Sequence, residues 1–118
     1  MGYHSRADFA AVRAVLLARL GHPAEAEAQI REAITLGHTT SHFHHMEFDI
    51  ASAFALMGRA GDALHWLQRT ADDGMPAYEL FAGDPTLATL RTDPRFVRFL
   101  ATERARNERL RALLTAPM

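Results

Sequence analysis

The stretch from residue 46 to residue 74, MEFDIASAFALMGRAGDALHWLQRTADDG, constrains the fold of this chain more than any other. It predicts two amphipathic helices joined by a tight turn at Gly58–Gly61, because apolar residues three and four positions apart fall on one helix face. The stripe of the first helix is Ile50, Ala51, Phe54 and Met57, and that of the second is Ala63, Leu64, Leu67 and Ala71. Small residues let the two backbones approach closely. We therefore expect a helical hairpin whose halves cover each other's apolar faces.

The same pattern occurs 37 residues earlier. Ala14, Leu17, Gly21, Ala26, Ile30 and Ala33 correspond to Ala51, Phe54, Gly58, Ala63, Leu67 and Thr70. Both copies resemble the tetratricopeptide repeat, a helical hairpin that recurs about every 34 residues. The resemblance covers about residues 6–76, with about three extra residues in the 38–41 connection, and Glu47 stands where the family has an early tryptophan.

The resemblance implies an all-α fold in which hairpins stack into an α–α superhelix closed by a C-terminal capping helix. We expect a single domain over residues 1–118, with hairpins at 5–37 and 40–74, a short helical linker at 76–92 and the cap at 93–115. The segment 84–96, DPTLATLRTDPRF, is similar to segments that follow such repeats at the C-termini of bacterial multidomain regulators.

For function, the resemblance implies a noncatalytic scaffold that binds a protein or peptide in the groove lined by the first helix of each hairpin. The groove positions of the family map onto Asp8, Ala11, Val15, Arg19, His45, Phe48, Ser52 and Leu56. Some members clamp a C-terminal carboxylate with Lys, Asn and Arg at such positions. Here Ala11, Val15, Phe48 and Ser52 replace them, which argues against that mode of binding. A mostly small and apolar groove suits an amphipathic helix or an extended apolar segment. The alternative is a homo-oligomerising or regulatory module of a larger bacterial regulator, in which the partner is a second copy.

The first predicted helix, from a Ser5 cap to about Leu20, carries one stripe of large apolar residues with smaller ones beside it. The large stripe is Phe9, Val12, Leu16 and Leu20, and the neighbouring residues are Ala10, Ala14 and Leu17. The second helix runs over about 23–36, with Gly37 as a left-handed stop. Thr40 or Ser41 is expected to cap the third helix.

The C-terminal third is predicted from two Asp-Pro pairs, in which Asp caps a helix and Pro occupies its first position. Asp84-Pro85 begins a short helix through Leu90, after a helical turn at 77–81, and Asp93-Pro94 begins a long helix to about Leu114. Its front half, with Phe96, Phe99, Leu100 and Glu103, is expected to face the body. Its back half, with Leu110, Leu113 and Leu114, projects or pairs with another chain.

Charge is unevenly distributed along the chain. Residues 91–118 contain seven arginines and three acids, whereas residues 1–90 contain six arginines and eleven acids. An acidic body and a basic tail are self-complementary, within a chain or between chains. The tail lacks interleaved aromatics, which favours a solvated helix face over nucleic-acid binding. Asp72 and Asp73 oppose the dipole of the helix they end, so either they meet arginines, with Arg91 and Arg95 as candidates, or the cost is tolerated.

His42, His45 and Asp49 lie three and four residues apart, so one helix face presents three groups that can bind zinc, nickel or copper. The cluster lacks an HExxH motif and an obvious fourth ligand, so ordinary surface histidines are the preferred interpretation and a metal-binding protein is the third alternative.

Enzyme signatures are missing from the sequence. The glycines are scattered at predicted turns rather than gathered in a phosphate-binding loop, no GxSxG elbow occurs and there is no cysteine. We therefore expect a protein that is not an enzyme and needs no cofactor. No signal-peptide core or run of 18 apolar residues is present, which predicts a cytoplasmic protein that does not enter a membrane.

Overall fold

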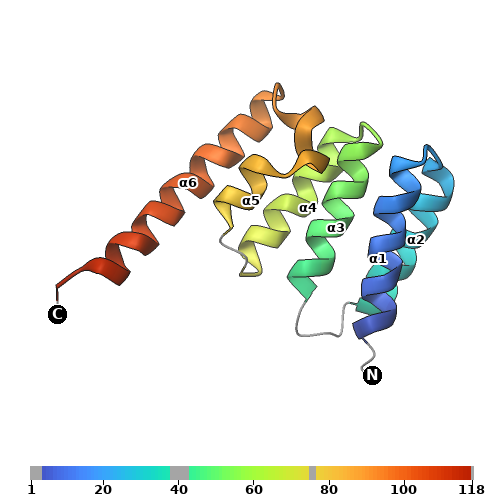
Figure 1. The fold of residues 1–118 in the computed structure, drawn as a ribbon, viewed down its shortest axis with the longest axis horizontal. Helices are drawn as coiled ribbons and strands as arrows, with labels where there is room; N and C mark the ends of the chain where they lie inside the picture. Colours follow the sequence, from blue (N-terminus) through green and yellow to red (C-terminus); the bar gives the residue numbers. More distant parts are fainter. Residues whose placement is uncertain (1–3, 38–42, 75–76, 118) are drawn as a thin grey trace.

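The computed structural model describes residues 4–37, 43–74 and 77–117, and within these ranges it contains helices and no strand (Figure 1). The elements in chain order are α1 (His4–Arg19), α2 (Pro23–Gly37), α3 (Phe43–Leu56), α4 (Ala60–Asp72), α5 (Tyr78–Gly83), the 3-10 helix η1 (Pro85–Leu90) and α6 (Pro94–Thr115). The all-α prediction is confirmed for this part of the chain.

The first four helices form two hairpins, α1–α2 and α3–α4, whose turns are built alike. Gly21 and Gly58 have φ angles of +79° and +76°, a left-handed conformation that favours glycine. The amide of His22 donates to the carbonyl of Leu17, and that of Arg59 donates to Phe54, both at 2.9 Å. These bonds, spanning five residues, close the first helix of each hairpin with a Schellman turn. The repeat of 37 residues in the sequence is thus also a repeat of turn geometry.

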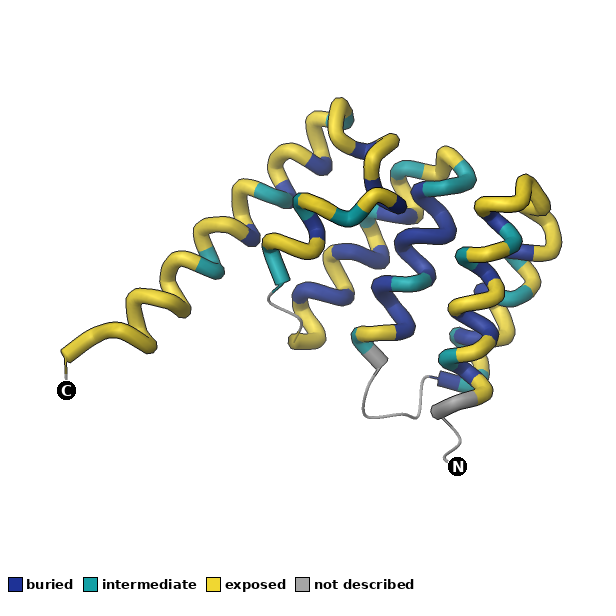
Figure 2. Tube along the Cα trace, in the orientation of Figure 1, coloured by how far each residue is buried: buried dark blue, intermediate teal, exposed yellow. Residues whose placement is uncertain are grey.

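The two hairpins lie side by side, with α1 against α3 (Figure 1). The face of α1 that is buried consists of small residues: Ala7, Ala10, Ala11, Ala14 and Ala18. Across from it, α3 is buried along nearly its whole length, as the dark tube in Figure 2 shows. Alanines at the contact let the helix axes approach closely. The larger apolar stripe of α1 consequently points away from the core.

A short connection, α5 and η1, crosses α3 and covers part of it. The hydroxyl of Thr86 lies 3.0 Å from that of Ser52, and Thr89 donates to the carbonyl of Ala55. Phe81 of α5 packs against Phe48, with ring centroids 6.0 Å apart. Leu87 and Leu90 are also buried. This connection therefore occupies the surface that α3 would otherwise present to solvent.

Both Asp-Pro predictions are confirmed. The carboxylate of Asp84 accepts from the amide of Thr86 at 2.8 Å, and that of Asp93 accepts from Arg95 at 2.8 Å. As expected, Phe96 and Phe99 of the front half of α6 are buried. The C-terminal half extends away from the other helices, and its last turns are exposed throughout (Figures 1 and 2).

Three local predictions are wrong. Ser5 does not cap α1, because that helix begins at His4. Gly37 is not among the described glycines with a positive φ angle; it is the buried last residue of α2. Asp72 meets Arg106, at 3.9 Å, rather than Arg91 or Arg95, because α6 runs back past the end of α4. Thr40 and Ser41 lie outside the described residues.

Candidate functional site

The most unusual surface of the described chain is the outer face of α1. Phe9, Val12, Leu16 and Leu20 are 59%, 54%, 55% and 62% exposed. Single exposed apolar residues are ordinary on protein surfaces, but contiguous ones mark interaction sites. These four recur at spacings of three and four residues, so they form a continuous row along the helix. We call this row the α1 stripe.

An open hollow of about 290 Å³ borders the α1 stripe. Val12, Val15, Leu16 and Arg19 of α1 line one side, and Asp49 of α3 lines the other. Its walls are thus mainly aliphatic, with one cation and one carboxylate at fixed places. Sites for amphipathic segments have this composition, with apolar contact area and a few charges that orient the partner.

The charged form of Asp49 is disfavoured by its surroundings in the hollow. Burial raises the pKa of Asp49 to about 6, and repulsion from the carboxylates of Asp8 and Asp84 raises it further, against a lowering by His45. Two further carboxylates, one from α1 and one from the residue before η1, therefore act on Asp49 of α3. A cation brought to this place relieves that repulsion, because an opposite charge favours the ionised form of a carboxyl.

The eight predicted groove residues divide into two groups. Asp8, Val15, Arg19 and His45 lie along the accessible rim between α1 and α3, and Leu56 is half-buried. Ala11, Phe48 and Ser52 are buried, which corrects the prediction that they face a partner. Ala11 lies on the buried face of α1, whereas α5 and η1 cover Phe48 and Ser52.

The sequence prediction missed three contributors to the site: Val12, Leu16 and Asp49. The sequence does show Val12 and Leu16 as members of an apolar stripe. However, this helix has alanines on one face and large apolar residues on another, and the sequence alone does not say which face is buried. Asp49 was noted only as a metal ligand. The signal for its actual surroundings, repulsion from Asp8 and Asp84, depends on residues that are distant in sequence.

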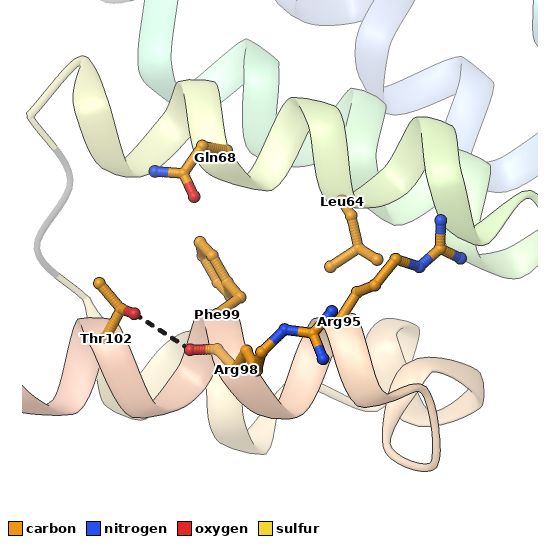
Figure 3. A pocket seen from close by; sticks show the side chains of 6 residues that line it. All are labelled: Leu64, Gln68, Arg95, Arg98, Phe99 and Thr102. Atoms are coloured by element: carbon orange, nitrogen blue, oxygen red, sulfur yellow. Dashed lines mark hydrogen bonds between the residues drawn. The ribbon is translucent and has the colours of Figure 1, made fainter.

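A second hollow, of about 280 Å³, lies between α4 and α6 (Figure 3). Leu64 and Phe99 form its apolar part, and Arg95 and Arg98 stand at its edge. Arg95 is committed to Asp93, with an Nη2–Oδ2 distance of 2.8 Å. One of its two arginines is thus already paired within the chain. This hollow is therefore the weaker candidate for a binding site.

Glu47 is a fully buried carboxyl on α3, and it bears on stability rather than on binding. Burial, followed by the neighbouring carboxyl of Asp73, raises its pKa to about 7, whereas Arg69 lowers it. Nε of Arg69 lies 3.3 Å from Oε2 of Glu47. The guanidinium also lies 4.8 Å from the centre of the Trp66 ring. The ion pair thus joins a buried carboxyl to a half-exposed guanidinium.

The predicted metal ligands are only partly described. His42 lies outside the described residues, while His45 and Asp49 stand one turn apart on α3. In the ranges that are described, no group of three or more His, Cys, Asp or Glu side chains is placed to hold a metal ion. A search of the same ranges finds no helix with the length and apolar character needed to span a bilayer.

Comparison with known proteins yields no match to any protein-family model, curated protein or solved structure. The function is therefore argued from the geometry of this chain alone.

Proposed function

We propose that this chain is a noncatalytic protein-interaction module that binds a basic, amphipathic helical segment along the α1 stripe. The observation that carries the proposal is the row of four large apolar side chains, each more than half exposed, beside a hollow that contains the carboxylate of Asp49. Exposing such a row to water is unfavourable by roughly 25 cal/mol per Å² of apolar surface, and a partner removes this cost.

We further propose that the two hairpins are tetratricopeptide-like repeats. Equivalent positions of the two hairpins are equally buried. Ala26 and Ala63 are both fully buried, and so are Ala33 and Thr70. The shared Schellman turns support the same interpretation. In such an architecture the first helices of successive hairpins carry the binding surface. Here η1 covers the second of them, which leaves α1 as the open part of the groove.

The chemistry of the hollow supports a partner of this kind. The aliphatic side chains of Val12, Val15 and Leu16 match the apolar face of a helix, read at spacings of three, four and seven residues. The carboxylates of Asp8, Asp49 and Asp84 favour Arg or Lys beside that face. An acidic or uniformly polar segment would leave the stripe uncovered and increase the repulsion.

A designed peptide tests this proposal. It is an amphipathic helix of about 18 residues of Leu, Ala and Arg, labelled with a fluorophore, and a matched peptide carries Glu in place of Arg. We expect the basic peptide to raise the fluorescence anisotropy on titration with the protein and the acidic peptide to bind much more weakly. Leu16→Gln should weaken binding about tenfold or more, since a buried leucine contributes about 1.5–3 kcal/mol.

Val97→Gln is the matched control, because Val97 is 53% exposed on α6, close to the 55% of Leu16. It should bind the peptide as the unmodified chain does. Equal affinity for the two peptides, or equal binding by the Leu16→Gln and Val97→Gln variants, would remove the α1 stripe as the site.

A further inference from the structure

We infer that the segment that binds the α1 stripe is the C-terminal half of α6 from a second copy of this chain. This inference rests on the proposed function, because it names the occupant of the same site. It would make the protein a head-to-tail assembly, in which each copy offers a groove at one end and a helix at the other.

The first support is the apolar pattern of α6. Phe96 and Phe99 are buried against the body, and Glu103, one turn further, is also buried. The same helix face continues to Leu110 and Leu114, because steps of three and four residues stay on one side of a helix. Here it has left the body: Leu110, Leu113 and Leu114 are 40%, 74% and 86% exposed. The apolar face of α6 that packs on the core thus continues beyond it, where its leucines are exposed.

The second support is charge. Residues 104–115 carry four arginines and one acid. Arg109 and Arg111 flank the leucine face at roughly 100° on either side, by the helical rotation per residue. Nη2 of Arg111 lies 3.2 Å from Oε1 of Glu79, and such pairs between exposed side chains contribute little to stability. A leucine row flanked by arginines complements a hollow with aliphatic walls and the carboxylate of Asp49, on which the nearby carboxylates of Asp8 and Asp84 act.

The third support is shape. The twelve residues from 104 to 115 span about 18 Å as a helix, close to the length of the α1 stripe from Phe9 to Leu20. The α1 hairpin and the end of α6 lie at opposite ends of the molecule, whose longest dimension is 50 Å (Figure 1). The tail therefore cannot reach the groove of its own chain, and the contact has to join two copies. Such a heterologous contact leaves a free groove and a free tail, so assembly continues unless a ring closes.

Complementation between two full-length variants tests the inference. The groove variant carries Val12→Gln and Leu16→Gln, and the tail variant carries Leu113→Gln and Leu114→Gln. All four positions are exposed, and glutamine preserves both the charge and the helix propensity, so both variants should fold. Masses are measured by sedimentation from about 10 µM to about 1 mM, because a single helix in a groove makes a small interface of modest affinity.

We expect the unmodified chain to associate as its concentration rises, and each variant alone to remain a monomer. An equimolar mixture should form a 1:1 heterodimer, because the intact tail of the groove variant fits the intact groove of the tail variant. Val97→Gln should associate like the unmodified chain. About 0.5 M NaCl should weaken the association, since the charges lie near the surface.

Three results would overturn the inference. An unmodified chain that stays monomeric over the whole range contradicts it; so does a tail variant that associates normally. Association without recovery in the mixture would indicate a symmetric contact between like surfaces. The designed Leu-Ala-Arg peptide separates the two proposals: if it binds the stripe of a monomeric chain, the interaction module stands and only self-assembly fails. If it does not bind either, both fail.

Discussion

At the scale of single residues, Glu47 is a buried carboxyl whose charge is only partly compensated. The carboxyl is fully buried, with Arg69 on one side and the carboxyl of Asp73 on the other. Removing a carboxylate from water is costly unless it is paired, and the half-exposed Arg69 pairs it incompletely. The result is a glutamate whose pKa is about 7, close to neutral pH. Its neutral form is the one that the fold accommodates better.

The stability of the protein should therefore decrease with rising pH. Between pH 4.5 and about 7 the folded chain keeps a proton on Glu47 that the unfolded chain has released, so the free energy of unfolding falls across this window. Asp49 acts in the same direction between 3.8 and about 6. Urea denaturation should give a lower free energy of unfolding at about pH 8 than at about pH 5.

Glu47→Gln should remove the part of this dependence that lies above about pH 6, and should make the protein more stable than the unmodified chain at about pH 8. Glu32→Gln, at an exposed position of α2, is the control and should leave the profile unchanged. A Glu47→Gln profile parallel to that of the unmodified chain would show that this carboxyl does not titrate as described.

Gly58 carries the second residue-scale prediction. Its φ angle of +76° is costly for any residue with a Cβ, although the added atom would meet nothing within 4 Å. Gly58→Ala should therefore lower the free energy of unfolding by about 1–2 kcal/mol through the backbone alone. Gly83→Ala is the matched control, since its surroundings are equally open and its φ is not positive. It should be neutral or stabilising by up to about 1 kcal/mol. Equal losses at the two positions would contradict this explanation.

At the scale of elements, the sequence was sufficient for the hairpins, their glycine turns and both Asp-Pro helix starts. These features depend on residues close together in the chain. The orientation of α1 was not predictable in the same way, because its alanine row and its large apolar row both have helical periodicity. The packing of α1 against α2 and α3 selects the alanines for burial. The placement of η1 over Ser52 is likewise a contact between distant segments.

The attachment of η1 gives an element-scale prediction. Leu87 is fully buried, so Leu87→Ala should lower the free energy of unfolding by about 2–5 kcal/mol through the cavity it leaves. Leu80→Ala on α5 is the control, because Leu80 is 39% exposed, and its cost should be much smaller. Urea denaturation measures both. Similar losses would mean that η1 contributes little to the stability of the fold.

At the scale of the whole molecule, an apolar and acidic surface lies at one end and an apolar and basic helix at the other. The uneven charge along the sequence predicted such self-complementarity, but it could not say where the two surfaces lie. In the folded chain the two surfaces are far apart (Figure 1). A contact between them therefore has to join two copies of the chain. Because Phe48 and Ser52 are buried, the proposed binding surface is restricted to its α1 side.

The most direct test of the α1 stripe as a binding surface is a methyl NMR titration of the unmodified chain with the designed Leu-Ala-Arg peptide. We expect the methyl signals of Val12, Val15 and Leu16 to shift with peptide concentration, while those of Val97 on α6 and Leu64 on α4 stay in place. Shifts centred on Leu64 would move the site to the hollow between α4 and α6. The absence of any shift at the α1 methyls would contradict the proposed function.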